Sequence, residues 1–243
     1  MPPPDASQRV EEPVILAQTD GWLVLHKPAG WHTVAQEGGS PQTVEAWLAA
    51  TLPAQAALPE CGLVHRLDAS TTGCLVVART AADHQRLRDA FTADVTRAAG
   101  TTPAIRKEYL AVVLDQLPDT GRFALYFTSR HKGSRKVTVS DRGDPPTRGL
   151  CNWATVGPAT VPHHRIIRVV LDGPGRRHQI RAGLAHQGAP LLGDALYGGA
   201  EHPMGAALHA WRVCVDGQWV EAPPDSRFTP AATTQSQPGD SCR

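Results

Sequence analysis

Short runs of apolar and β-branched residues, separated by turn residues, dominate the chain beyond residue 105. Runs of this length and composition are typical of β-strands. We predict strands at residues 109–114, 123–128, 136–140, 151–156, 165–171 and 211–215. Many strands with few helices favour an α+β fold, in which flanking helices cover a mixed, mostly antiparallel sheet.

The first part of the chain combines strands and helices. Residues 14–17 and 22–25 are predicted strands around a Thr-Asp-Gly turn, and residues 62–64 and 74–78 are predicted buried strands. Residues 43–51 fit a short helix capped near Ser40. Residues 80–95 fit a longer helix, and residues 182–187 begin a third. The longer helix should turn four side chains to the core: His84, Leu87, Ala90 and Phe91.

Composition narrows the class of protein. With 243 residues, 41% of them apolar, the chain is long enough to bury a substantial core. Its five cysteines are odd in number and form no Cys-x-x-Cys pair, which favours neither a disulfide framework nor a zinc ribbon and fits the reducing cytoplasm. Residues 1–11 do not resemble a signal peptide, and no apolar run is long enough to span a membrane.

A turn at residues 65–73 carries the side chains best suited to chemistry. Asp68 lies between Arg66 and the hydroxyl-bearing Thr71 and Thr72, and apolar runs flank the turn. We therefore expect Asp68 to lie on a loop held by rigid elements. An arginine near an aspartate is more often a surface ion pair, so this turn alone does not identify a catalytic residue.

Five ordered motifs together resemble the RluA-type pseudouridine synthases, which isomerise uridine in structured RNA. Together the five cover roughly residues 12–228; the turn carries one of them, His-Arg-Leu-Asp followed by Thr-Thr-Gly, and four others complete the set. They are Leu-Val-Leu-His-Lys-Pro-Ala-Gly at 23–30, Lys-Glu-Tyr-Leu-Ala-Val-Val at 107–113, Gly-Arg-Arg-His-Gln-Ile-Arg at 175–181 with Leu-Gly-Asp-Ala-Leu-Tyr-Gly at 192–198, and Ala-Leu-His-Ala at 207–210.

The resemblance implies a pseudouridine synthase-like fold with a central RNA-binding cleft. It implies a flexible N-terminus at residues 1–11, a catalytic domain at 12–228 and a disordered tail at 229–243. Many family members carry a small N-terminal S4 domain, and we expect a stand-alone catalytic domain here because the first motif begins near residue 22. Two positions depart from the common pattern, His26 for Asn and Thr72 for Ser, and both bear on substrate choice more than on chemistry.

The family reaction breaks the bond from uracil to ribose, rotates the base and rejoins it through carbon 5. By resemblance Asp68 is the nucleophile, Tyr109 takes part in the final proton transfer, and Arg181 is the permanent cation that keeps the carboxylate ionised. The covalent adduct could form at the sugar or at the base. A phenol is a poor base unless its site tunes it, so the role of Tyr109 stays open.

A stacked uridine must leave its helix before it can reach an aspartate. We expect Arg66 to fill the vacated stack.

Net charge is only +1, yet residues 122–148 hold seven cations against two aspartates, and residues 165–181 hold five arginines against one aspartate. These segments are either solvated faces or the walls of an RNA cleft. The predicted RNA-binding residues are Arg66, His65, Thr71, Thr72, Arg176, Arg177, Lys132 and Arg135.

The predicted function is an RNA pseudouridine synthase acting on rRNA or tRNA, without cofactor, metal or obligate protein partner, as a monomer. His65, His178 and His209 match no compact metal-ligand pattern and are expected to be core histidines. Asp194 is expected to be structural. The alternative is a catalytically idle relative that binds RNA as a folding or ribosome assembly factor; keeping Asp68, Tyr109 and Arg181 together argues against it.

Overall fold

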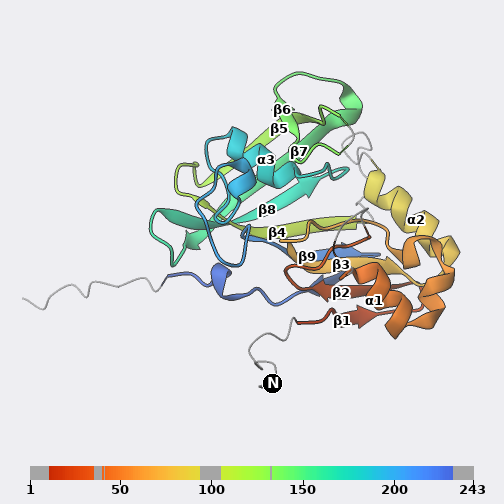
Figure 1. The fold of residues 1–243 in the computed structure, drawn as a ribbon. Helices are drawn as coiled ribbons and strands as arrows, with labels where there is room; N and C mark the ends of the chain where they lie inside the picture. Colours follow the sequence, from red (N-terminus) through yellow and green to blue (C-terminus); the bar gives the residue numbers. More distant parts are fainter. Residues whose placement is uncertain (1–10, 36–39, 41, 94–104, 132, 232–243) are drawn as a thin grey trace, which may run out of the picture.

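The computed structural model describes residues 11–35, 40, 42–93, 105–131 and 133–231, which form one large sheet covered by three helices (Figure 1). The strand order is β1-β2-β3-β9-β4-β8-β7-β5-β6, and β10 pairs with β9. Only β3 and β9 pair in parallel among these strands. The strands are β1 (Val14–Gln18), β2 (Trp22–Lys27), β3 (Thr72–Ala78), β4 (Ile105–Leu114), β5 (Thr120–Thr128), β6 (Thr138–Ser140), β7 (Arg148–Pro158), β8 (His164–Asp172), β9 (Leu208–Val215) and β10 (Gln218–Glu221).

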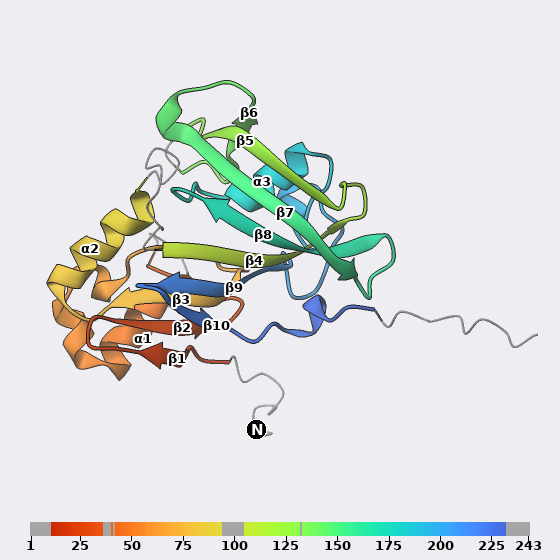
Figure 2. The ribbon, with the colours of Figure 1, turned by 180° about the vertical axis from the view of Figure 1, so that it is seen from behind.

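The predicted fold class is confirmed, and burial explains the sequence pattern of each strand. Every residue of β3 is buried, in keeping with its continuous apolar run, whereas β5 alternates between buried and exposed positions. All three helices lie on one face of the sheet, and the view from behind shows β4, β7 and β8 with no helix over them (Figure 2). The site described below lies on the helix side.

The helices lie close to their predicted positions. Helix α1 (Val44–Thr51) is capped by Thr43, not near Ser40, because the Thr43 hydroxyl accepts from the Ala46 N–H. Helix α2 (Ala81–Thr92) ends at Thr92, three residues early, since the backbone turns extended at residue 93. Its His84, Leu87 and Phe91 are buried as predicted, and the fourth predicted residue, Ala90, is partly buried. Helix α3 (Gln179–His186) begins three residues earlier than predicted.

Two strand predictions need correction. Residues 62–64 are buried but form a single bridge, Leu63 to Val77, because Gly62 adopts a left-handed φ of 82° after a short 3-10 turn. Strand β10 was missed. Its hairpin turn, Asp216–Gly217, has φ values of 49° and 82°, as expected for the Asp-Gly signal of a two-residue hairpin loop.

Two of the remaining predictions concern loops and the tail. Residues 96–103 and 141–148 are rich in Gly, Pro, Thr and charged residues, which predicts two loops. Residues 96–103 and most of the predicted tail lie outside the described residues, whereas residues 141–148 contain a short 3-10 turn at Pro145–Thr147. In the described part of the chain, no helix has the length and apolarity needed to cross a membrane.

Candidate active site

The turn that carries Asp68 is held from beneath by strand β2. The Thr71 N–H donates to the Asp68 carbonyl at 3.0 Å, which closes the turn. The next carbonyl, that of Ala69, accepts from the Gly30 N–H at 2.8 Å and from the Lys27 ammonium at 3.2 Å. The position of Asp68 is therefore fixed through its own backbone carbonyl and that of the next residue.

Lys27 is fully buried at the end of β2. Its ammonium also donates to the carbonyls of Pro28, at 2.9 Å, and Trp31, at 2.8 Å, so three carbonyls surround the charge. Burial lowers the pKa of Lys27 to about 7, against the opposing attraction of Asp68. In the sequence, Lys27 stands out only as part of the motif at residues 23–30, and no local pattern shows that it anchors the turn.

Thr71 and Thr72 are buried and do not reach the cleft surface. The Thr72 hydroxyl lies 2.7 Å from Nδ1 of His209, and Nε2 of His209 lies 3.1 Å from the Ala222 carbonyl. Since a carbonyl only accepts, Nε2 carries the proton and Thr72 donates to Nδ1. The Thr72 hydroxyl thus bonds to a buried histidine in this structure. His209 is fully buried and hydrogen-bonded, as expected for a core histidine.

Arg181, on α3, joins two carboxylates with one guanidinium. Its Nε and Nη2 donate to Asp194 at 2.7 and 2.8 Å, and its Nη1 donates to Oδ2 of Asp68 at 2.8 Å. Asp194 is 1% exposed, whereas the Asp68 side chain is 31% exposed. Burial lowers the pKa of Arg181, but the hydrogen bonds to both carboxylates outweigh it and raise that pKa above its ordinary value. A buried, permanently charged guanidinium therefore uses two N–H groups on buried Asp194 and presents a third, on Nη1, to the accessible Asp68 carboxylate.

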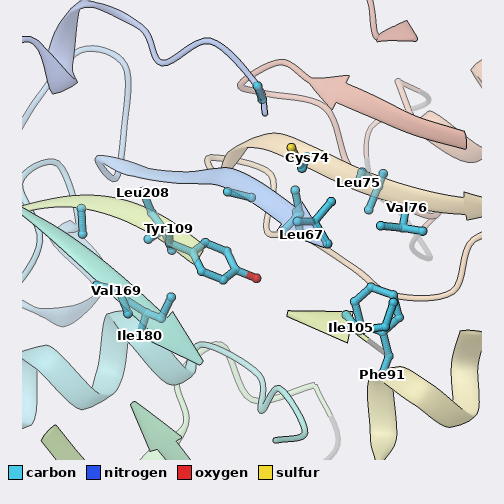
Figure 3. Close-up of a cluster of buried hydrophobic side chains, with 14 of the residues drawn as sticks. Leu67, Cys74, Leu75, Val76, Phe91, Ile105, Tyr109, Val169, Ile180 and Leu208 are labelled. Carbon is cyan, nitrogen blue, oxygen red and sulfur yellow. The ribbon is translucent and has the colours of Figure 1, made fainter. Parts of the chain in front are cut away.

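Tyr109 lies on β4 and is 8% exposed. Figure 3 shows its ring extending from the strand with the hydroxyl directed toward the region between Leu67 and Phe91, two residues that also line the cleft. Burial raises the pKa of Tyr109 above its usual value. The phenol therefore stays protonated at neutral pH and can act as a hydrogen-bond donor.

Asp68, Tyr109 and Arg181 line one cleft of about 930 Å³. Arg66 is exposed at this cleft, next to the carboxylate. His65 forms part of the wall: its ring stacks on Phe91 at 4.2 Å, and its Nε2 accepts from the Val76 N–H at 2.9 Å. Burial lowers the pKa of His65 to about 3, so it is a neutral wall residue and not a cation for phosphate.

The cationic residues are divided between the cleft and other surfaces. Arg135, Arg176 and Arg177 line the cleft, and Arg177 donates to the carbonyls of Ser134 and Arg135 at 2.6 and 3.0 Å. Lys132 lies outside the described residues. Of the five arginines at residues 165–181, the first two do not reach the cleft, because they form ion pairs elsewhere: Arg165 with Asp115 and Asp119, and Arg168 with Glu108.

Sequence reasoning missed Lys107, which is buried in the cleft wall. Its ammonium donates to the Gly173 carbonyl at 3.2 Å and lies 5.5 Å from the centre of the Phe91 ring. Burial lowers the pKa of Lys107 to about 8. The strand period of two could have indicated it, because Lys107 and Tyr109 must face the same side of β4.

These positions agree with a comparison to known families. A profile of the RNA pseudouridylate synthases matches residues 21–186, a span that contains Asp68, Tyr109 and Arg181. The chain belongs to this family. The family resemblance read from the five motifs is therefore confirmed.

Two bacterial pseudouridylate synthases illustrate the similarity. Ribosomal large subunit pseudouridine synthase D of Yersinia pestis is 34% identical over 194 residues, covering 78% of this chain and 54% of the relative. The protein of the same name from Vibrio vulnificus is 34% identical over 195 residues, covering 79% and 55%. The chain thus spans about half the length of the curated relatives it matches.

Solved pseudouridylate synthase structures share the fold. Human RNA Pseudouridylate Synthase Domain Containing 1 superposes with a TM-score of 0.66 at 21% identity, covering 93% of this chain and 91% of the human one. Human RNA Pseudouridylate Synthase Domain Containing 4 gives 0.64 at 18% identity, covering 88% and 89%. At these identities the likeness establishes the architecture alone.

Proposed function

We propose that this chain isomerises uridine in RNA to pseudouridine, with Asp68 as the nucleophile. The observation that carries the proposal is the pair of contacts made by Arg181. Its guanidinium is fixed by buried Asp194 and donates a hydrogen bond to the accessible Asp68 carboxylate in the cleft. An ion pair of this kind keeps a carboxylate charged and oriented while one of its oxygens stays available for attack.

The net reaction replaces the N1–ribose bond with a carbon 5–ribose bond, and N1 ends with a proton in place of carbon 5. Asp68 forms a covalent adduct, either with the ribose or with the base, while the bond from N1 to the sugar breaks. The base then rotates in the cleft, carbon 5 bonds to the sugar, the bond to Asp68 breaks and its carboxylate is released, and the carbon 5 proton leaves while N1 gains one. Tyr109 supports this last step, because a protonated buried phenol can orient the uracil or relay the proton through a water molecule.

RNA binding follows from the cations at the cleft. Arg66 is exposed beside Asp68 and can replace the flipped base in the stack. Arg135, Arg176 and Arg177 supply charge for phosphates. We propose rRNA as the first candidate substrate, because the named bacterial relatives are ribosomal large subunit pseudouridine synthases, with tRNA as the other.

The decisive test compares Asp68→Asn with Asp119→Asn, a control on an exposed aspartate that pairs with Arg165 outside the cleft. Purified proteins are incubated with total RNA from a strain lacking the gene, and pseudouridine is mapped at each position. We expect product from the wild type and the control, and none from Asp68→Asn, which should still bind RNA. Product from Asp68→Asn would refute the nucleophile assignment; RNA binding by wild type without product would favour an idle RNA-binding relative.

Base flipping has its own test. Arg66→Ala should lower turnover on folded RNA much more than on a short unpaired oligomer, since only the folded substrate needs a filler for the vacated stack. Equal losses on the two substrates would remove this role.

A further inference from the structure

His178 lies between the Asp68 carboxylate and a tyrosine on the far side of the cleft wall. Its Nε2 is 3.7 Å from Oδ2 of Asp68, and its Nδ1 is 2.8 Å from the hydroxyl of Tyr197. The Tyr197 oxygen in turn accepts from the Val137 N–H at 3.0 Å. His178 also adopts a left-handed φ of 54° just before α3, a strained conformation for a residue other than glycine.

The neighbouring groups decide where the ring proton lies. An ionised Asp68 can only accept hydrogen bonds, so the arrangement is more favourable when the imidazole nitrogen that faces it, Nε2, carries the proton. The Val137 N–H already occupies one acceptor site of the Tyr197 oxygen, which leaves the phenolic proton to be donated to Nδ1. In this arrangement the Tyr197 hydroxyl donates to Nδ1, and the neutral imidazole carries its proton on Nε2, which faces the Asp68 carboxylate at 3.7 Å, a distance longer than a hydrogen bond.

We propose that His178 is a positioning residue for Asp68, and that Tyr197 holds it in the tautomer protonated at Nε2. The proposal rests on the nucleophile assignment made above. Arg181 and His178 both approach Oδ2 of Asp68, and among the described residues no side chain hydrogen-bonds to Oδ1. One hydrogen bond from Arg181 and an imidazole nitrogen 3.7 Å from the same oxygen restrict the rotation of the carboxylate and leave the other oxygen to react.

The same contacts join Asp68 to the basic loop between β5 and β6. Val137 belongs to this loop, and Arg177, next to His178, donates to the loop carbonyls of Ser134 and Arg135. The Tyr197 ring also lies 5.5 Å from the Arg181 guanidinium and 5.9 Å from the Lys136 ammonium. The segment that carries cations for RNA and the groups that orient Asp68 therefore share one anchor, Tyr197.

The charge state of His178 agrees with this geometry. Burial lowers the pKa of His178; Asp68 and Asp194 oppose that change, and Arg181 and Arg177 add to it. At neutral pH the His178 ring is uncharged. Its neighbours therefore determine which of its two nitrogens carries the proton.

The first test reads the tautomer directly in the free protein. Long-range ¹H–¹⁵N NMR of the imidazoles, with His178 assigned by its loss in His178→Gln among the eleven histidines, should show Nε2 protonated and Nδ1 bare. Tyr197→Phe keeps the ring but removes the hydroxyl, and should shift population to the other tautomer. A protonated Nδ1 in the wild type, or no change in Tyr197→Phe, would overturn the proposal whatever the role of Asp68.

The second test separates positioning from folding and from RNA binding. His178→Gln can present an amide N–H to Asp68, while His178→Ala cannot, and both replacements bear the same backbone strain. We expect single-turnover rates to fall about 10- to 100-fold in His178→Ala and Tyr197→Phe, with partial recovery in His178→Gln. The two His178 variants should keep their RNA affinity within about twofold of the wild type. Equal rates for Gln and Ala, or losses confined to RNA affinity, would refute the positioning role.

Discussion

Replacing Arg181 with Met should destabilise the folded protein strongly, because the change leaves a carboxylate buried without its cation. Asp194 is 1% exposed and receives both of its guanidinium hydrogen bonds from Arg181, at 2.7 and 2.8 Å. Removing one partner of a buried pair costs about 3–5 kcal/mol. Two unit charges 4 Å apart at an effective dielectric constant of about 20 give a similar figure, about 4 kcal/mol.

The other end of the same guanidinium provides a matched control. The Asp68 side chain is 31% exposed and receives one hydrogen bond from Arg181. Asp68→Asn should therefore change stability by about 1 kcal/mol or less, as is usual for solvent-exposed pairs, although it removes the proposed nucleophile. The two carboxylates differ in burial, and stability should follow burial while activity follows access to the cleft.

Urea unfolding followed by tryptophan fluorescence measures these differences. For a chain of this size, a loss of 3–5 kcal/mol corresponds to a decrease of about 6–20 °C in Tm. The double variant Arg181→Met/Asp194→Leu should recover most of the loss, because it removes the orphaned charge. A loss below about 1 kcal/mol in Arg181→Met, or additive losses in the double variant, would refute the reasoning.

Three further outcomes are expected. Gly73→Ala should cost at least about 1–3 kcal/mol, measured by urea unfolding, because its φ is 105° and a Cβ would lie within 2.2 Å of the Ala210 carbonyl; wild-type stability would contradict this. Arg135→Ala should reduce the slope of log Kd against log salt for RNA by about 0.7–0.9, whereas Arg165→Ala, outside the cleft, should leave it unchanged. The pKa of buried Lys27, about 7, lies below the value of a lysine in the unfolded chain. Above pH 7 the native state therefore binds fewer protons than the unfolded state does. Wild-type stability relative to Lys27→Met should rise with pH from 7 to 10, by up to about 1.4 kcal/mol per unit, and a flat difference would contradict that assignment.

Local patterns in the sequence predicted most of the strands and their mostly antiparallel pairing. They failed where a backbone turn decides the outcome. Residues 62–64 have the composition of a strand, but the left-handed Gly62 prevents them from extending along β3. Strand β10 has four residues, three of them exposed, so its periodicity is weak and only the Asp-Gly turn indicates it.

The site could be predicted only in part, because its contacts join segments far apart in the chain. The motifs predicted that Arg181 serves Asp68, and the two lie 2.8 Å apart. They could not show that the Thr72 hydroxyl is hydrogen-bonded to His209, or that Tyr197 accepts a hydrogen bond from Val137, 60 residues earlier in the chain. Such partners depend on how the elements pack, which single-strand or single-helix periodicity does not encode.

The parallel pairing of β3 with β9 has a consequence for how the protein folds. Asp68 immediately precedes β3, whereas Tyr109, Arg181 and Asp194 all follow on the other side of that seam, and 113 residues separate Asp68 from Arg181. Closing so long a loop is entropically slow and is rewarded only once both halves have collapsed. During synthesis Asp68 leaves the ribosome well before Arg181, its hydrogen-bond partner. We therefore expect the carboxylate proposed as the nucleophile to gain that partner late in folding, so that a partly folded chain lacks the complete site.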